Sequence, residues 1–324
     1  MEQLLHTYYG IQNGEELLVN QRKGIIADNS IYFIMDANNN EIIHMEQAVL
    51  SSYLAKHHYP YVAEPIQNIH GDWFTTYQGK KYMVLQVNHM KETSHLPHGE
   101  ELANFHNIGA TYQYQPQTIS SYGQWEQLWI NKLTIFENQI EQYTTERSTY
   151  YARLLMDSLP YLIGISENAI QYLHESEQEQ RFHEVDQGTI TFHRYQSNVL
   201  QQIIWPDDLI YDHPTRDLAE FIRVKWLEGT ENPNQEVIQF LNDYQTVRPL
   251  SIFSWRLIYA RLLFPIHLFD VIAKSFLAQS TEDHYAKLDY MLKQQTVYES
   301  RLRDFFHVVG LDTESLSIPV LNWL

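Results

Sequence analysis

The sequence predicts an α+β fold of two lobes, a small β-rich lobe followed by a larger helical lobe. Between residues 18 and 87, short apolar runs alternate with turn residues, which is typical of strands. From Gly99 onward, apolar residues recur at spacings of three and four, which is typical of helices. The polar segment between them ends at Pro97 and suits a linker. We therefore expect an N-terminal lobe, a hinge linker and a C-terminal lobe at residues 1–90, 91–98 and 99–324.

Length and composition are those of a globular protein. The chain has 324 residues, of which 44% are hydrophobic and 19% are charged, so a large core can be buried. It has no cysteine, which excludes disulfides, thiolate metal sites and a cysteine nucleophile. The first residues, MEQLLHTYYG, lack the basic and then apolar pattern of a signal peptide. Export by that route is not expected.

The charge balance argues against two classes of partner. Lys and Arg number 22 against 40 for Asp and Glu, which gives a formal net charge of −18. Such a surface repels nucleic-acid phosphates and anionic lipid. The most apolar region, residues 251–278, is interrupted by charged residues and broken at Pro265, so it predicts two buried helices. We expect neither a nucleic-acid partner nor insertion into a membrane.

The elements of the N-terminal lobe follow one another clearly. Strands are expected at GIIA, where Gly24 would serve a turn, and at SIYFIMDA, before a turn of three asparagines at residues 38–40. Apolar spacing then predicts a helix over residues 44–56, with Met45, Ala48, Val49 and Leu54 on its apolar side. The run DWFTTYQGKKYMVLQV predicts a hairpin that turns at residues 78–80.

The C-terminal lobe is predicted to be mostly helical. Only residues 189–204 have strand-like runs. Helical spacing predicts helices at residues 99–109, 121–143, 150–158, 162–176, 215–227 and 234–244, and throughout 251–308. No repeat of fixed period is present, so a solenoid is not expected.

Four motifs in the chain point to a known family. They are GEELANFHNIG with Leu102, Ala103 and His106, then FHRYQSNV, YDHPTRDLAEFIR and YARLLFPIHLF. Together they resemble the aminoglycoside and choline phosphotransferase superfamily, and within it the YutH-type branch of the CotS family of spore-coat-associated proteins. The resemblance covers about residues 18–308. It implies a bilobal fold like that of protein kinases.

Phosphoryl transfer in this superfamily needs a carboxylate base, an aspartate that binds Mg²⁺ and a lysine that binds phosphate. If His193 is the histidine of the catalytic loop, the resemblance places Tyr195 at the base. It also places Trp205 at the metal-binding aspartate and Met35 at the lysine. A phenol titrates near 10 and an indole offers no oxygen ligand, so neither replaces a carboxylate. A glycine-rich phosphate loop is absent from the sequence, and we expect no catalytic residue.

Two residues remain as candidates for binding a cofactor. Asn198 follows His193 by five residues where seven are usual, so either the loop is shortened or Asn198 is only a turn residue, which we favour. Asp207 matches a second acidic position and could recruit a cation. Glu46, without a lysine partner, is expected to be a solvated charge on a helix. We therefore predict neither a bound cofactor nor a metal site.

Other chemistries find little support in the sequence. The tightest histidine groups, His57 with His58 and His95 with His98, lack the carboxylate spacing of a metal site. The pattern G-x-S-x-G of a hydrolase is absent. The 23 tyrosines suit apolar packing with a polar tip, although exposed pairs could instead make protein contacts or cross-links.

The resemblance implies a pseudokinase, a protein with the fold of a kinase but without its enzymatic activity. It implies a role in sporulation, with other spore coat proteins as partners. It implies synthesis in the mother-cell cytoplasm and then a place in the spore coat. The alternative is a residual or active ATP-dependent phosphotransferase of small molecules, in which Asp207, Asp212 or Asp217 supplies the lost ligands. For Asp217 we favour a structural role, because the family's Asp-Leu-Ala carboxylate orders the catalytic loop and buried carboxylates need partners.

Overall fold

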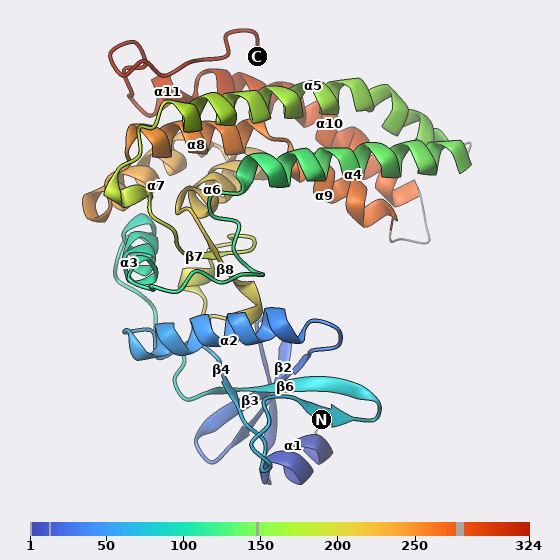
Figure 1. The fold of residues 1–324 in the computed structure, drawn as a ribbon, viewed down its shortest axis with the longest axis vertical. Helices are drawn as coiled ribbons and strands as arrows, with labels where there is room; N and C mark the ends of the chain where they lie inside the picture. Colours follow the sequence, from blue (N-terminus) through green and yellow to red (C-terminus); the bar gives the residue numbers. More distant parts are fainter. Residues whose placement is uncertain (1, 13, 147–148, 277–281) are drawn as a thin grey trace. The chain divides into compact units, whose positions relative to one another are not determined.

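The chain forms two compact units. The computed structural model describes residues 2–12, 14–146, 149–276 and 282–324 (Figure 1). Unit 1 comprises residues 1–120 and 188–212, and unit 2 comprises residues 121–187 and 213–324. These units are defined by their internal contacts and do not test the linker expected at residues 91–98, which stays a prediction.

Unit 1 is built on an antiparallel sheet. Its strands are β1 (Glu15–Val19), β2 (Arg22–Ala27), β3 (Ser30–Asp36), β4 (Glu64–Ile66), β5 (Thr75–Tyr77) and β6 (Lys80–Val87). They lie in the order β1-β2-β3-β6-β4, and β5 also pairs with β6. Gln78 and Gly79 both have positive φ between β5 and β6, which suits a two-residue hairpin turn. The predicted hairpin is thereby confirmed.

Gly24 does not serve a turn as expected. It lies inside β2, opposite Phe33 of β3. A Cβ atom added at this position would approach Cε1 of Phe33 to 2.6 Å. The strand therefore needs glycine here because the Phe33 ring packs directly on its backbone.

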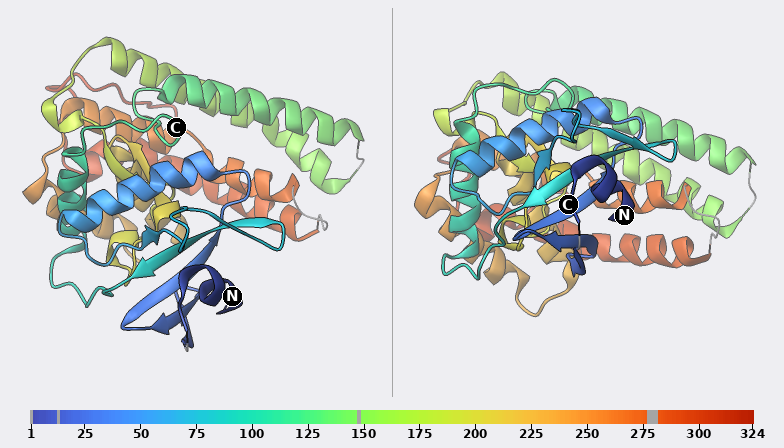
Figure 2. Two further views of the ribbon diagram at one scale, coloured as in Figure 1. Left: turned by 60° about the horizontal axis from the view of Figure 1, so that its bottom comes forward. Right: turned by 90° about the horizontal axis from the view of Figure 1, so that it is seen from below.

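Helices cover both faces of this sheet. On one face α2 (Glu41–Lys56) contributes Ala48 to a cluster with the inward side chains of β3. Its burial pattern confirms the predicted helix except at Val49, which is 49% exposed, since Leu50 and Leu54 take the buried positions. On the other face lies α1 (Glu2–Tyr9), which the sequence analysis missed (Figures 1 and 2). The third helix, α3 (His98–Ala110), matches the predicted helix at residues 99–109.

A second, two-stranded sheet in unit 1 carries the segment that resembles the catalytic loop. It pairs β7 (Thr189–Phe192) with β8 (Leu209–Asp212). Between them lie two short 3₁₀ turns, η2 (Asn198–Leu200) and η3 (Pro206–Asp208). The strand-like run predicted for residues 189–204 is therefore only partly strand, because the chain turns after β7.

Unit 2 is helical. Its long helices α4 (Trp125–Glu146) and α5 (Tyr150–Gln178) run side by side (Figures 1 and 2). The two helices predicted at residues 150–158 and 162–176 are one, because the apolar face that includes Leu155 and Leu162 continues past Pro160. A 3₁₀ turn, η1 (Glu184–Asp186), precedes β7. The other helices are α6 (Thr215–Glu228), α7 (Pro233–Val247), α8 (Ile252–Leu263), α9 (Ile266–Phe276), α10 (Glu282–Arg303) and α11 (Phe305–Val308).

The most apolar part of the sequence forms two helices, as predicted. The chain breaks at Pro265 between α8 and α9, both of which are mostly buried. Among the helices described, none combines the length and the apolar character needed to cross a membrane.

A buried histidine in α9 should make the protein sensitive to acid. Burial, followed by the charge of Arg223, lowers the pKa of His267 to about 3, while its Nε2 lies 2.9 Å from Oε1 of Gln295. Between that value and about 6.5 the unfolded chain binds the proton and the folded chain does not. The stability due to neutral His267 is therefore present above pH 6.5 and is lost as the pH falls toward 3.

We expect wild type to lose about 2 kcal/mol more unfolding free energy between pH 7 and pH 5 than the His267→Gln variant. Glutamine keeps a donor for Gln295 but does not titrate. Urea unfolding at the two pH values measures the difference, with the exposed His70→Gln as control. An unchanged pH dependence in His267→Gln would contradict the assignment.

Candidate functional site

Met35, which the family resemblance places at the phosphate-binding lysine, is a core side chain. It lies on β3 and is 8% exposed. The apolar cluster around it includes Ala48 of α2, Met83 of β6, and Ile203 and Trp205. A thioether in such surroundings contributes packing and offers no charge to a phosphate.

Trp205, which the family resemblance places at the metal-binding aspartate, fills the space next to β3. It is 2% exposed and meets the Phe33 ring edge-on, with 4.7 Å between the ring centroids. The Arg22 guanidinium lies 4.4 Å from the indole centroid. Within the described part of the chain, the buried indole Nε1 has no hydrogen-bond partner. Trp205 is therefore held by apolar, aromatic and cation–π contacts.

Asp207, one of the two expected cofactor candidates, already has a cationic partner. Arg22, at the start of β2, donates from Nη1 and Nη2 to Oδ1 and Oδ2 of Asp207, each at 3.0 Å. This paired geometry satisfies both carboxylate oxygens. A metal ion at Asp207 would have to displace Arg22.

Asn198, the other candidate, contacts an acidic residue that the sequence analysis did not single out. Its Nδ2 donates to Oδ2 of Asp208 at 3.2 Å, and its Oδ1 accepts from the backbone N–H of Gln196 at 2.7 Å. Burial, then the charge of Asp207, raises the pKa of Asp208. Asn198 therefore contacts both the turn at Gln196 and Asp208, the last residue before β8. The interpretation of Asn198 as only a turn residue stays a prediction, and nothing in the sequence indicated its contact with Asp208.

Tyr195, which the family resemblance places at the catalytic base, is buried rather than presented to solvent. It is 1% exposed, and its hydroxyl lies 2.6 Å from Nε2 of His98 at the start of α3. The Phe192 ring lies 5.6 Å away, centroid to centroid. His193 is exposed, and its backbone N–H donates to the carbonyl of Asp208 at 2.7 Å. Tyr195 therefore packs in the interior, while His193 lies at the surface.

A buried ion pair lies beside this loop and was missed as well. Lys91 pairs with Glu101 of α3, and its Nζ also donates to the carbonyl of Val199. The ammonium lies 5.1 Å from the centroid of Tyr61, and burial lowers the pKa of Lys91 to about 8. In the sequence, Lys91 belongs to a polar segment that resembles a linker, so only the folded chain brings it to Val199.

Helix α2 holds the two-stranded sheet through backbone contacts. Glu46 is not a solvated charge as expected, because its carboxylate accepts the backbone N–H groups of residues 117, 118 and 119 at 2.9–3.1 Å. Next to it, Gln47 donates to the carbonyls of Asp207 and Leu209 at 3.2 and 3.3 Å. The helix glutamate thus orders a loop and does not hold a lysine.

In unit 2, the buried carboxylate of Asp186 accepts several hydrogen bonds. Its carboxylate accepts from the hydroxyls of Ser251 and Ser254 at 2.6–2.7 Å and from the backbone N–H of His183 at 2.7 Å. His213 Nδ1 accepts from the backbone N–H of Thr215 at 3.2 Å, so Nε2 carries the proton and donates to Asp186 at 3.1 Å. Although burial alone raises it, these hydrogen bonds hold the pKa of Asp186 below its usual value.

This cluster does not have the arrangement of a hydrolase triad. There, histidine lies between the serine and the aspartate, whereas here Asp186 lies between His213 and the two serines. Asp186 is 1% exposed and His213 is 0% exposed. The cluster is therefore structural. Asp217, for which we expect a structural role, is likewise 0% exposed in the first turn of α6.

The histidines and tyrosines singled out in the sequence are spread over the fold. His57 Nδ1 lies 2.7 Å from the carbonyl of Tyr53, and His98 contacts Tyr195. In the described residues, no three His, Asp or Glu side chains gather as metal ligands would. The adjacent Tyr150 and Tyr151 are 86% and 2% exposed. Of this pair only Tyr151 packs in the core, through a hydroxyl contact of 2.6 Å with Ser275.

Comparison with known proteins identifies the fold and the family. An aminoglycoside phosphotransferase from Alicyclobacillus acidocaldarius superimposes with a TM-score of 0.60 at 11% identity over 93% of each chain. The amicoumacin kinase hAmiN, solved with AMP-PNP, Ca²⁺ and Ami, gives 0.57 at 14% identity over 97% of this chain and 95% of its own. The predicted kinase-like α+β fold is thereby confirmed.

The sequence itself is similar to the endospore coat-associated protein YutH of Bacillus subtilis strain 168. The two are 33% identical over an alignment of 305 positions, and the match covers 91% of this chain and 89% of that protein. The model of the family described as "Spore coat putative kinase YutH" matches residues 2–305. The resemblance inferred from the four motifs is confirmed, and the chain belongs to this YutH family of kinase-like spore coat proteins.

Proposed function

We propose that the protein is a pseudokinase that acts in the spore coat through its surface and not through phosphoryl transfer. The observation that carries this proposal is Trp205, a buried indole at the position where the family resemblance places the metal-binding aspartate. It packs against Phe33 and Arg22. An ATP·Mg²⁺ complex needs an oxygen ligand at that point.

The charges of neighbouring residues support the same proposal. A triphosphate is stabilised by cations that face it, but Arg22 is paired with Asp207 and Lys91 with Glu101. Met35 contributes no charge, and Tyr195 makes its contact with His98. Binding of a nucleotide in this unit would have to break these ion pairs and separate a packed apolar cluster.

The place of action follows from the family. The B. subtilis relative is named as endospore coat-associated. We propose that this chain is made in the mother-cell cytoplasm, joins the spore coat and binds other coat proteins there. A fluorescent fusion of the full chain should then form a ring around the developing spore, and diffuse fluorescence in the mother cell would contradict this.

ATP with Mg²⁺ is expected to leave the melting temperature unchanged. At about 1 mM ATP, a site with a Kd of about 10 µM would add about 2.7 kcal/mol of stability, which differential scanning fluorimetry detects readily. An active aminoglycoside phosphotransferase measured in parallel is the positive control. A saturable shift that requires Mg²⁺ would overturn the proposal that the site is lost.

A second candidate function rests on the contact between Asn198 and Asp208. In an ATP-dependent phosphotransferase of small molecules, these two oxygen-bearing side chains would take over the binding of Mg²⁺. ATP turnover by the wild type that is lost in the Asp208→Asn variant would establish this activity. A thermal shift without turnover would instead indicate a protein that binds nucleotide but does not transfer phosphate.

A further inference from the structure

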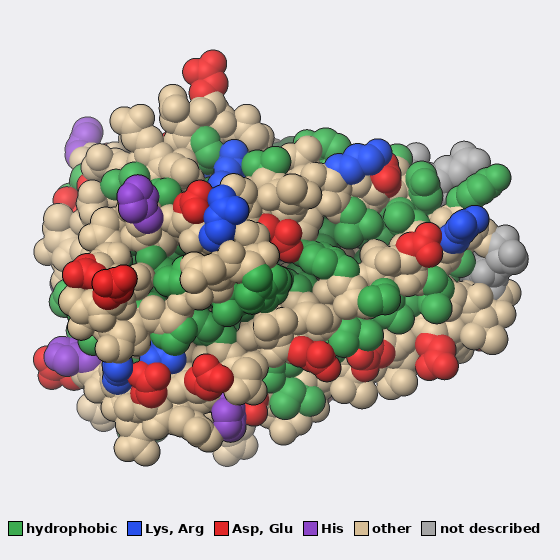
Figure 3. Space-filling view, turned by 90° about the horizontal axis from the view of Figure 1, so that it is seen from above, with side chains coloured by type: hydrophobic (Ala, Val, Ile, Leu, Met, Phe, Trp, Pro, Cys, Tyr) green, Lys and Arg blue, Asp and Glu red, His purple; other side chains and the backbone are tan. Residues whose placement is uncertain are grey.

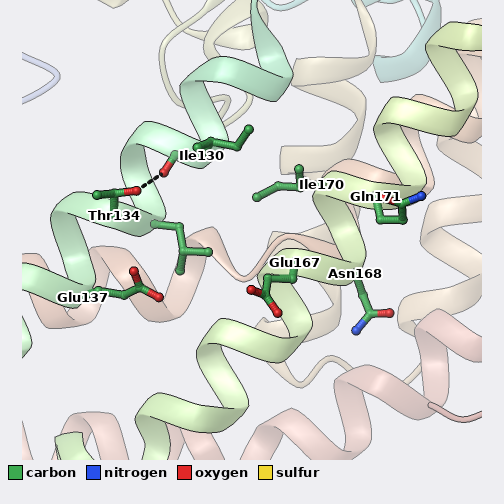
Figure 4. Close-up of a pocket in the computed structure, with 8 residues that line it drawn as sticks. Ile130, Thr134, Glu137, Glu167, Asn168, Ile170 and Gln171 are labelled. Atoms are coloured by element: carbon green, nitrogen blue, oxygen red, sulfur yellow. Dashed lines mark hydrogen bonds between the residues drawn. The ribbon is translucent and has the colours of Figure 1, made fainter.

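Helices α4 and α5 of unit 2 border a groove of about 600 Å³ (Figure 4). Helix α4 lines it with Ile130, Leu133, Thr134 and Glu137, and α5 lines it with Glu167, Asn168, Ile170 and Gln171. The α4 residues recur at intervals of three and four, so the groove follows the helix for about two turns. A groove that follows a helix in this way can receive a third helix laid along the first two.

The groove has an apolar floor and an acidic end. Leu133 is 8% exposed at its base, while Ile130 remains 38% exposed. Glu137 and Glu167 come from opposite helices and lie toward the same end of the groove (Figure 4). Neither carboxylate pairs with a cation among the residues that the structure describes. Two unpaired carboxylates beside an apolar floor favour an occupant that is both apolar and basic.

Helix α4 also exposes apolar side chains away from the groove. Leu128 is 40% exposed and Ile135 is 54% exposed, and at about 100° per residue both lie on the side of α4 opposite Ile130 and Glu137. The face of the molecule drawn in Figure 3 shows patches of hydrophobic side chains among carboxylates that are more widespread than Lys and Arg. The apolar surface of the groove is therefore limited to its own lining residues, Ile130, Leu133 and Ile170.

We propose that the α4/α5 groove binds an amphipathic helix of another coat protein, with apolar side chains on one face and Lys or Arg beside them. This rests on the proposed function of the chain in the coat, and it names the chemistry of the partner. The acidic end of the groove disfavours nucleic acid and anionic membrane. A second copy is disfavoured as well, because each chain carries a net charge of −18.

The test uses the full chain and a labelled peptide of about 18 residues with leucines at i, i+3, i+4 and i+7 and lysines beside them. Fluorescence anisotropy measures its Kd. The Glu137→Lys, Glu167→Lys double variant should bind at least about tenfold more weakly, since two attractions become repulsions. The matched control is Glu15→Lys with Glu16→Lys on exposed β1, which changes the net charge equally and should bind as wild type does.

A second variant tests the apolar floor without altering charge. Ile130→Ser should also weaken binding, by about three- to tenfold, because it removes apolar area from the contact. A scrambled peptide of the same composition separates groove recognition from general attraction to an acidic protein. Equal binding of the scrambled peptide, or equal binding by the double variant, overturns the proposal. So does a dimer that the double variant abolishes, which would make a second copy the occupant.

Spores distinguish the failure of this inference from failure of the proposed function. If the wild-type fusion forms a ring and the Glu137→Lys, Glu167→Lys fusion is diffuse, both proposals are supported. If both fusions form rings, the groove is not the docking site, although the coat function stands. A diffuse wild-type fusion contradicts the coat function itself, and the peptide measurement then decides alone whether the groove binds a basic helix.

Discussion

Replacing Trp205 with alanine is expected to lower the free energy of unfolding by about 3–5 kcal/mol. The indole is 2% exposed, and its contacts with Phe33 and Arg22 link the turn before β8 to the sheet of unit 1. Alanine would leave a cavity between elements that are far apart in the sequence. Urea unfolding followed by circular dichroism measures the loss.

Two further variants separate cavity formation from general effects of removing tryptophan. Trp323→Ala removes a side chain that is 57% exposed and should change stability by less than about 0.5 kcal/mol. Trp205→Phe should cost less than about 1.5 kcal/mol, because it keeps most of the volume and removes a buried N–H that lacks a partner. A Trp205→Ala protein as stable as wild type would show that Trp205 does not hold the unit together.

The packing of Trp205 also predicts the effect of placing an aspartate at this position. Trp205→Asp would place a carboxylate between Phe33 and the Met35 cluster, while Arg22 already pairs with Asp207. An unpaired buried carboxylate is costly. Introducing the aspartate that the family resemblance implies here is therefore expected to destabilise the chain and not to create a metal site. In the proposed pseudokinase, the side chain that lacks the ligand oxygen is also the one that fills its space.

Features encoded locally were predicted well from the sequence. The positive-φ pair at Gln78 and Gly79 fixes a hairpin by itself, and Pro265 ends α8 by itself. In each case the information lies within a few residues of the element concerned.

Features that depend on contacts between distant residues were not predicted. The Glu46 carboxylate accepts hydrogen bonds from backbone N–H groups 71–73 residues away. The sequence near Glu46 gives no sign of these donors, so a solvent-exposed charge was expected. Lys91 meets the carbonyl of Val199, which is 108 residues away. Asn198 contacts Asp208, which is 10 residues away on the other side of the turn between β7 and β8. Periodicity identifies which face of a helix is buried, but it does not identify the partners of a single polar group.

Removing the carboxylate of Asp186 is expected to be as damaging as removing Trp205. In the Asp186→Ala variant, Ser251, Ser254 and the Nε2–H of His213 lose their common acceptor, and these groups are buried or nearly so. We expect a loss of about 3–5 kcal/mol in the free energy of unfolding, because buried donors would remain without partners. Urea unfolding at pH 7 measures this loss.

The pH dependence of the same variant tests the cause. Because hydrogen bonds hold the pKa of Asp186 below its usual value despite burial, its stabilising effect is present at neutral pH and is lost as the pH falls through that lowered pKa. Wild type and Asp186→Ala should therefore converge in stability in acid. Asp157→Ala, which removes an exposed carboxylate 3.8 Å from Arg153, is the control and should stay within about 0.5 kcal/mol of wild type. A constant difference between wild type and Asp186→Ala at every pH would show that packing, and not the charged hydrogen bonds, accounts for the role of Asp186.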